Sequence, residues 1–175
     1  MPARARFEEE VLPHLDAGYN LARWLARNAH DADDVMQEAC VRALRYIDSV
    51  RPGKARSWFL TIVRHAFYDW CKVNRPAELV YDSQDSVAAM ADSVVIDPES
   101  AALRGVEARR LAEVVDALPL PLRETLVLRE LEELSYKEIA HVLGVPIGTV
   151  MSRLSRARAA LLEVTQEVQI RRGRV

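Results

Sequence analysis

The stretch "LSYKEIAHVLGVPIGTVMSRLSRARAAL", residues 134–161, predicts two helices joined by a tight corner. Ser135 and Glu138 have the S-x-x-E spacing of a capping box, which marks the start of the first helix. Gly144 stands where a helix-ending left-handed residue belongs, and Pro146 suits the start of the next helix. The second helix then has a stripe of apolar residues at helical spacing: Val150, Leu154, Ala157 and Leu161. This pattern is typical of a helix-turn-helix.

The second helix of this pair is basic. Thr149, Arg153 and Arg156 form a second stripe, which we expect to face outward. Arginines on such a face can pair with guanine edges or phosphates in a major groove. A solvated arginine face on an ordinary helical hairpin is the plainer alternative. The small inner residue Ala140, the glycine corner and the capped first helix coincide with the basic helix, and together they favour DNA binding.

The composition predicts a globular, helical protein. Half of the 175 residues are hydrophobic and 29% are charged, with only six glycines and eight prolines. The net charge of −2 is unevenly distributed. Residues 51–75 hold six Lys and Arg against one acid, and residues 144–175 hold six Arg against two acids. Between these basic blocks, residues 79–103 contain five acids and no Lys or Arg.

Sites for metals, cofactors and membranes are not indicated. Cys40 and Cys71 have no C-x-x-C spacing, and the four histidines are scattered singly, so we expect thiols in a reducing compartment, no metal and no cofactor. No apolar run approaches the roughly 20 residues of a membrane helix. The N-terminus has no apolar signal core. We therefore expect a cytoplasmic protein without membrane insertion.

Helical periodicity also extends over the first part of the chain. It predicts helical structure from Phe7 to Asn28, and a further helix that Asp31 or Asp33 would cap. Ser57 would cap a third helix, which should end before Pro76. The inner face expected for the second of these helices consists of Val35, Met36, Cys40, Leu44 and Ile47.

The periodicity stops near residue 79 and resumes near residue 101. Residues 101–118 predict a helix that the "LPLPL" stretch ends, and residues 123–134 predict another helix. The expected fold is therefore all-α, with two small helical domains joined by an acidic linker. The domain boundaries that we expect are 1–78, a linker at 79–103, and 104–175.

The third helix of the first domain combines aromatic and basic residues. It holds five of the eleven aromatic residues, between basic residues on either side. Such a combination suits the unstacked bases of single-stranded nucleic acid. Because Trp58 and Phe59 share an apolar face with Ile62, we expect these two rings in the core. We expect nucleic-acid contacts from the residues nearer the helix end: Arg64, Tyr68, Lys72, Asn74 and Arg75.

Three segments, in this order, resemble a bacterial RNA polymerase sigma factor of the extracytoplasmic-function group. "DADDVMQEACVRALR" resembles the family's helix that binds core polymerase. "WFLTIVRHAFYDWCKVNR" resembles its segment that melts and reads the −10 element. "LPLPLRETLVLRELEELSYKEIAHVLGVPIGTVMSRLSRARAAL" resembles its region 4, which reads the −35 element. The resemblance covers roughly residues 7–162 and implies an alternative sigma factor that directs promoter recognition, melting and transcription initiation, often in a stress response.

The resemblance also implies roles for particular residues. Contact with the clamp helices of core polymerase would come from Asp34, Gln37, Glu38 and Arg42. The segment around Lys72, Asn74 and Arg75 would hold a flipped −10 base. The −35 major groove would receive Thr149, Ser152, Arg153 and Arg156, with Arg158 nearer phosphate. The acidic linker would run toward the RNA exit path. Further implied partners are the polymerase flap, promoter DNA and an anti-sigma protein.

Three positions depart from the usual pattern of the family. His65 stands where asparagine is frequent after arginine, which leaves the role of that position open. Met151 stands where lysine is common and Ser155 where histidine is common, and each change removes a possible phosphate contact.

Two other classes of protein are alternatives. A stand-alone helix-turn-helix regulator would need a sensing domain, but no βα alternation or phosphoacceptor pattern precedes the DNA-binding half. An enzyme would need a nucleophile, metal or acid–base cluster, and none has the required spacing.

Overall fold

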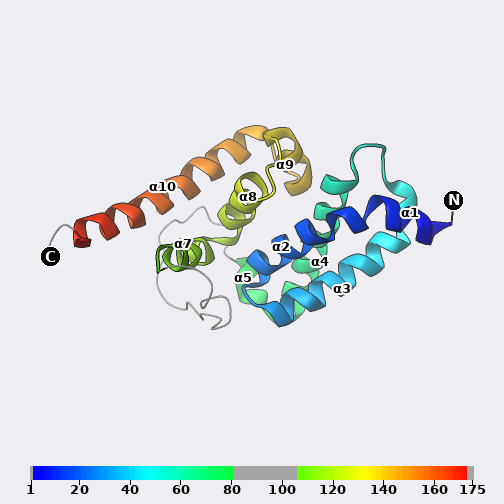
Figure 1. The fold of residues 1–175 in the computed structure, drawn as a ribbon, viewed down its shortest axis with the longest axis horizontal. Helices are drawn as coiled ribbons and strands as arrows, with labels where there is room; N and C mark the ends of the chain where they lie inside the picture. The colour runs from blue at the N-terminus through cyan, green and yellow to red at the C-terminus, as the bar shows by residue number, and fades with distance from the viewer. Residues whose placement is uncertain (1, 81–105, 173–175) are drawn as a thin grey trace.

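The computed structural model describes residues 2–80 and 106–172 of the chain (Figure 1). Every regular element within these two ranges is a helix, so the expected all-α fold is confirmed. We call residues 2–80 the N-terminal half and residues 106–172 the C-terminal half. The expected acidic linker lies outside the described residues except for its first two positions, which complete a short helix.

The N-terminal half is a bundle of helices. Its elements are α1 (Ala3–Glu10), the 3-10 turn η1 (Leu12–His14), α2 (Leu15–Ala26), α3 (Ala29–Arg45), the 3-10 turn η2 (Ile47–Ser49), α4 (Ala55–Asn74) and α5 (Pro76–Val80). The stretch predicted as helical from Phe7 to Asn28 is divided by η1, which contains Pro13. Proline lacks an N–H and its ring clashes with the preceding helical turn, so the chain bends there.

Two predicted helix caps were wrong. Neither Asp31 nor Asp33 caps α3, because the Asn28 side chain accepts a hydrogen bond from the backbone N–H of Asp31. The helix therefore begins earlier than expected, at a residue type that caps equally well. Ser57 lies inside the first turn of α4, where its hydroxyl donates to the carbonyl of Lys54. The predicted end of α4 before the Arg-Pro pair is confirmed, since the helix ends at Asn74.

Alanines form the buried face of α3. Ala32, Ala39 and Ala43 are fully buried together with Val35, whereas Leu44, which we expected to face inward, is 46% exposed. The buried positions repeat at 32, 35, 39 and 43, the spacing of one helix face. Because alanine is small, this face lets α3 lie close to its neighbours α2 and α4 in the core.

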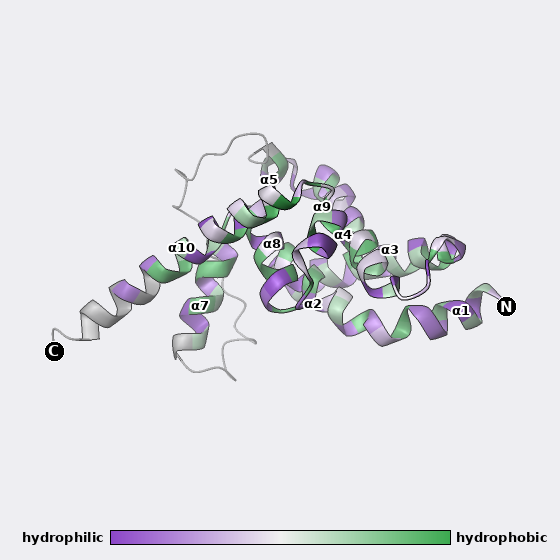
Figure 2. Cartoon of the chain, turned by 90° about the horizontal axis from the view of Figure 1, so that it is seen from above, coloured by the Kyte–Doolittle hydropathy of each residue, from purple (hydrophilic) through white to green (hydrophobic). Residues whose placement is uncertain are grey.

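The C-terminal half contains α7 (Val106–Ala117), α8 (Leu120–Glu130), α9 (Tyr136–Leu143) and α10 (Ile147–Arg172). The "LPLPL" stretch ends α7 as expected and also begins α8, because Pro119 precedes the helix and Pro121 lies in its first turn. Proline suits that turn, where N–H groups have no helical partner. Both halves combine hydrophobic and hydrophilic residues on each helix (Figure 2).

The expected helix-turn-helix is confirmed in α9 and the start of α10. Ser135 accepts a hydrogen bond from the N–H of Glu138, and the Glu138 carboxylate accepts one from the N–H of Ser135. Gly144 ends α9 with φ 66° and ψ 34°, the left-handed region that glycine enters freely. Val150, Leu154 and Ala157 are buried, and Leu161 is half-buried.

The two halves pack against each other. Helix α8 contacts α2, and α9 contacts α4, so the C-terminal half covers one side of the N-terminal bundle (Figure 1). The buried residues of both halves form one continuous hydrophobic cluster.

Gly18 of α2 lies close against side chains of α4. A Cβ atom added there would lie 2.6 Å from Cε1 of Phe59 and 3.2 Å from Cγ2 of Val63. We expect Gly18→Ala to lower the free energy of unfolding by about 1–3 kcal/mol, because overpacking outweighs the better helix propensity of alanine. Urea unfolding measures this change.

Gly148→Ala is the matched control, since no heavy atom lies within 4 Å of a Cβ at that position. There the gain in helix propensity should raise the free energy of unfolding by up to about 1 kcal/mol. Equal effects of the two substitutions would contradict the close packing of α2 on α4.

Candidate nucleic-acid interface

The residues expected to bind polymerase lie on α3. Asp34, Gln37 and Glu38 are exposed on its outer side. Arg42 is different, because its guanidinium lies 2.6 Å from the Glu38 carboxylate and 2.7 Å from that of Asp69 on α4. Arg42 therefore joins α3 to α4 and has little freedom to leave this position.

Two apolar residues that the sequence analysis did not assign to this surface also lie on the outer side of α3. Val41 is 53% exposed and Leu44 is 46% exposed. Together with Asp34, Gln37 and Glu38 they follow helical spacing, so they form one mixed apolar and acidic face. We call these five residues the α3 outer face. The sequence contains a signal for this orientation. Ala32, Ala39 and Ala43 form a stripe of small residues on the opposite side of the helix, and when that stripe is buried, Val41 and Leu44 face outward.

Asp69 of α4 contacts one residue from each of two expected sets. Arg42 belongs to the residues expected to bind polymerase, and Lys72 to those expected to bind the −10 element. The Asp69 carboxylate accepts hydrogen bonds from Lys72 at 2.9 Å and from Arg42 at 2.7 Å. These two donors lower the pKa of the Asp69 carboxyl. The Lys72 side chain remains 66% exposed, so its ammonium group can still meet a phosphate. His65, whose role we left open, is exposed on the same helix.

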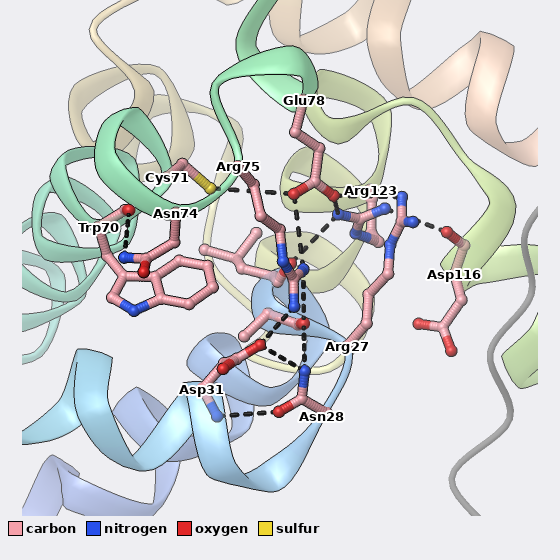
Figure 3. A network of polar contacts seen from close by, with 12 residues as sticks. Arg27, Asn28, Asp31, Trp70, Cys71, Asn74, Arg75, Glu78, Asp116 and Arg123 are labelled. Atoms are coloured by element: carbon pink, nitrogen blue, oxygen red, sulfur yellow. Dashed lines mark hydrogen bonds and ion pairs between the residues drawn. The ribbon is translucent and has the colours of Figure 1, made fainter.

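Arg75 lies in a network that joins the end of α4 to the corner between α2 and α3 (Figure 3). Its guanidinium donates to the carbonyl of Ala26 at 3.0 Å and forms an ion pair with Asp31. It also lies over the Trp70 ring, 5.0 Å from the ring centre. Asn74 is exposed and donates to the carbonyl of Trp70 at 2.9 Å. Arg75 therefore holds the bundle together in this conformation.

Arg64 and Tyr68 face the C-terminal half. Two guanidinium nitrogens of Arg64 lie 2.8 and 3.2 Å from the carboxylate of Glu124 on α8. The Tyr68 hydroxyl donates to the same carboxylate at 3.2 Å. The guanidinium also lies 4.4 Å from the centre of the Tyr68 ring. The Arg64 side chain is only 15% exposed, and Tyr68 beside it is half-buried.

The outward side of α10 differs from our expectation. Met151, Ser152 and Ser155 are exposed, together with Gly148, and we call these four residues the α10 outer face. Arg153, which we expected to face outward, is 18% exposed and lies 3.7 Å from Glu124. On a helix it falls about 60° from Val150, at the edge of the buried stripe.

The other −35 residues lie around this face. Ser152 is exposed, with its hydroxyl donating to the carbonyl of Thr149 at 3.0 Å. Thr149 and Arg156 are half-buried. Arg158 is exposed and pairs with Glu130 at 2.6 Å.

Arg123, which was not among the expected site residues, is the largest fully buried side chain among the described residues. From α8 it donates to the carbonyl of Leu25 at 3.2 Å, in the last turn of α2, and to that of Leu118 at 3.0 Å. It also donates to the carbonyl of Asp116 at 3.1 Å (Figure 3). Burial lowers the pKa of Arg123 to about 10, and neighbouring Arg27 adds to this effect. The sequence did contain a signal for these buried charges, because Arg123 and Glu124 interrupt the apolar pattern of α8.

Within the described residues, no group of three or more His, Cys, Asp or Glu side chains is arranged to hold a metal ion. None of the helices in the same two ranges has both the length and the apolar character needed to cross a bilayer.

Arg75 and Lys72 should respond differently to removal. Arg75→Ala should lower the free energy of unfolding by about 2 kcal/mol, because a carbonyl and a partly buried carboxylate lose their charged donor. Lys72→Ala should lower it by less than about 1 kcal/mol, since its ion pair is mostly exposed. Chemical unfolding of both variants measures the difference. Equal losses of stability would contradict the anchoring role of Arg75.

Known proteins resemble both halves. Residues 11–76 match sigma-70 region 2, and residues 108–161 match sigma-70 region 4. The ECF RNA polymerase sigma factor SigE of Mycolicibacterium smegmatis is 33% identical over 159 residues, which are 91% of this chain and 61% of SigE. The ECF RNA polymerase sigma factor EcfG of Rhodopseudomonas palustris is 34% identical over 163 residues, which are 92% of this chain and 86% of EcfG.

A solved structure has the same arrangement of helices. It is the sigma factor RpoE in complex with the anti-sigma factor NepR from Bartonella quintana, with a TM-score of 0.72 and 28% identity. The match covers 91% of this chain and 96% of that one. With both sigma-70 regions in order and identity above 30% to relatives along most of its length, the chain belongs to the extracytoplasmic-function group of sigma-70 factors.

Proposed function

We propose that this alternative sigma factor directs transcription initiation by binding core RNA polymerase through the α3 outer face and promoter DNA through both halves. The observation that carries the proposal is that two exposed surfaces of different chemistry lie on separate halves. The α3 outer face is mixed apolar and acidic, and the α10 outer face lies on the second helix of a helix-turn-helix.

The α3 outer face has the composition of a protein interface. Val41 and Leu44 are exposed apolar side chains that take no part in the core of the bundle, so their surface is available to a partner protein. Asp34, Gln37 and Glu38 surround them with groups that can accept hydrogen bonds from a basic partner. This arrangement fits the clamp helices of core polymerase, and region 4 would meet the polymerase flap.

The −35 element would be read by α10. Its outer face is formed by small and flexible side chains, which allow the backbone to approach a major groove closely. Ser152 can contact base edges, and exposed Met151 offers apolar contact such as a thymine methyl group accepts. Thr149, Arg156 and Arg158 would contact phosphates at the sides of this face, whereas Arg153 supports the helix from within through Glu124.

The −10 element would be read by the second half of α4. Lys72 and Asn74 are exposed at its end, and Tyr68 with Arg64 offers an aromatic ring beside a guanidinium. This combination suits unpaired bases and their phosphates. Both contacts would be weak alone, and polymerase would combine them in one bivalent complex. Polymerase and chromosome share the bacterial cytoplasm, so the proposed activity belongs there.

An anti-sigma protein is a further proposed partner. The support is that the solved relative RpoE is described in complex with an anti-sigma factor.

Run-off transcription tests the whole proposal. Purified core polymerase, the full chain and a library of genomic fragments should yield transcripts that require the chain, and their start sites should share two sequence motifs. Tight, sequence-specific binding by the chain alone, without new transcripts, would instead favour a stand-alone regulator.

Leu44→Glu should weaken binding to core polymerase about tenfold, because a carboxylate would replace apolar contact in the interface. Leu12→Glu is the matched control, since Leu12 is also 46% exposed but lies in η1, away from the α3 outer face. Surface plasmon resonance with immobilised core polymerase measures both variants. If both weakened binding equally, the assignment of the α3 outer face would be wrong.

Met151→Lys should make promoter binding by the reconstituted holoenzyme more dependent on salt concentration. An added cation beside the groove releases one more counterion, so the slope of log affinity against log salt should become steeper by about 0.9. Leu162→Lys adds the same charge farther along α10, beyond the helix-turn-helix. A salt series with filter binding should show the steeper slope for Met151→Lys only.

A further inference from the structure

Glu124 is shared by the two halves of the molecule. It belongs to α8 of the C-terminal half, its side chain is 1% exposed, and its carboxylate holds Arg64 and Tyr68 of the N-terminal half. The bond to Arg64 uses two guanidinium nitrogens, at 2.8 and 3.2 Å. A two-nitrogen fork of this kind is also how arginine holds a phosphate group. The Glu124 carboxylate is therefore held by the same kind of arginine fork that a phosphate group could accept.

Two more charged side chains of the same segment reach across to the N-terminal half. Arg123 donates to the carbonyl of Leu25 in α2. Glu132, which is 4% exposed, accepts hydrogen bonds from Asn20 at 2.6 Å and from Arg56 at 2.9 Å. The contact between the halves thus contains buried charges in addition to apolar packing.

The buried charges add little net stability to this contact. A buried carboxylate and guanidinium lose hydration, and their attraction returns roughly what the loss of hydration costs. Burial raises the pKa of Glu124, which reflects this loss, although Arg64 acts in the opposite direction. When the halves separate, both groups regain water, or Arg64 gains a phosphate. If a DNA phosphate takes the place of the Glu124 carboxylate, Arg64 still forms charge-assisted hydrogen bonds with an anion.

We infer that Glu124 is an intramolecular latch that covers the DNA-binding side of α4 at Arg64 and Tyr68 in the free chain, and that the halves must separate before α4 binds unpaired DNA. The inference rests on the proposed role of α4. The latch is asymmetric, because the α10 outer face stays exposed while Arg64 is 15% exposed and Tyr68 is half-buried. The free chain can present its helix-turn-helix to duplex DNA and still be unable to hold melted DNA.

Glu124→Gln tests the latch, because it removes the charge and keeps the shape of the side chain. X-ray scattering of the full chain should show a larger radius of gyration than wild type. Fluorescence anisotropy with a labelled single-stranded DNA of random sequence should show roughly fivefold tighter binding. That gain corresponds to an open fraction that rises from roughly a tenth to about half.

Glu8→Gln is the matched control. It removes the same charge, but Glu8 is exposed and pairs with Arg4 inside α1. Glu132→Gln is the second latch variant, since Glu132 joins the halves through Asn20 and Arg56 and leaves the Glu124–Arg153 pair in place. Thermal melts establish that each variant folds. If Glu124→Gln does not fold, Glu132→Gln decides the question by the same two measurements.

Expansion and tighter single-strand binding in the latch variants, with Glu8→Gln like wild type, are the expected results. Compact latch variants, unchanged single-strand affinity, or an equal gain in Glu8→Gln would each overturn the latch. Run-off transcription by the wild-type chain separates the two proposals. If it fails, the proposed function is wrong, whereas scattering and single-strand binding still decide whether Glu124 closes the molecule.

Discussion

The buried guanidinium of Arg123 is the constraint on which the relation between the two halves depends. A charged group removed from water needs several hydrogen-bond partners, and Arg123 finds them in carbonyls at the ends of α2 and α7. The carbonyl end of a helix attracts a cation, so α2 provides a fixed binding site for α8. With α8 held there, its next residue, Glu124, meets α4, and the helix-turn-helix that follows lies beside the N-terminal bundle.

Local signals in the sequence were sufficient for the helices and for the helix-turn-helix. Ser135, Glu138 and Gly144 act within one or two turns, so their roles could be read without knowledge of the rest of the chain. The orientations predicted for Leu44 and Arg153 differ from those in the structure, because they depend on neighbouring helices. The alanines of α3 take the buried side that Leu44 would otherwise occupy, and Glu124 attracts Arg153 to the edge of the core. No periodicity within one helix contains this information.

The same tertiary contacts divide the expected site residues into two kinds. Arg42, Arg75 and Arg153 form ion pairs that connect helices, whereas Asp34, Gln37 and Ser152 are exposed on helix surfaces. Arginine suits both purposes, because its planar guanidinium matches carboxylates as well as phosphates. Composition alone therefore overestimates how much positive charge the free molecule offers to DNA. The ion pairs show which arginines are already bound to a carboxylate of the same molecule.

The alanine face of α3 has a consequence for how this surface can change over time. A larger side chain at Ala32, Ala39 or Ala43 would force α2 and α4 apart, and such overpacking costs about 1–3 kcal/mol. Substitutions at Asp34, Gln37, Val41 or Leu44, which are exposed, do not enter the packing between these helices. Amino-acid substitutions in α3 are therefore tolerated better at the residues that face outward. Such substitutions change the surface that α3 offers to a partner, while the scaffold beneath it remains the same.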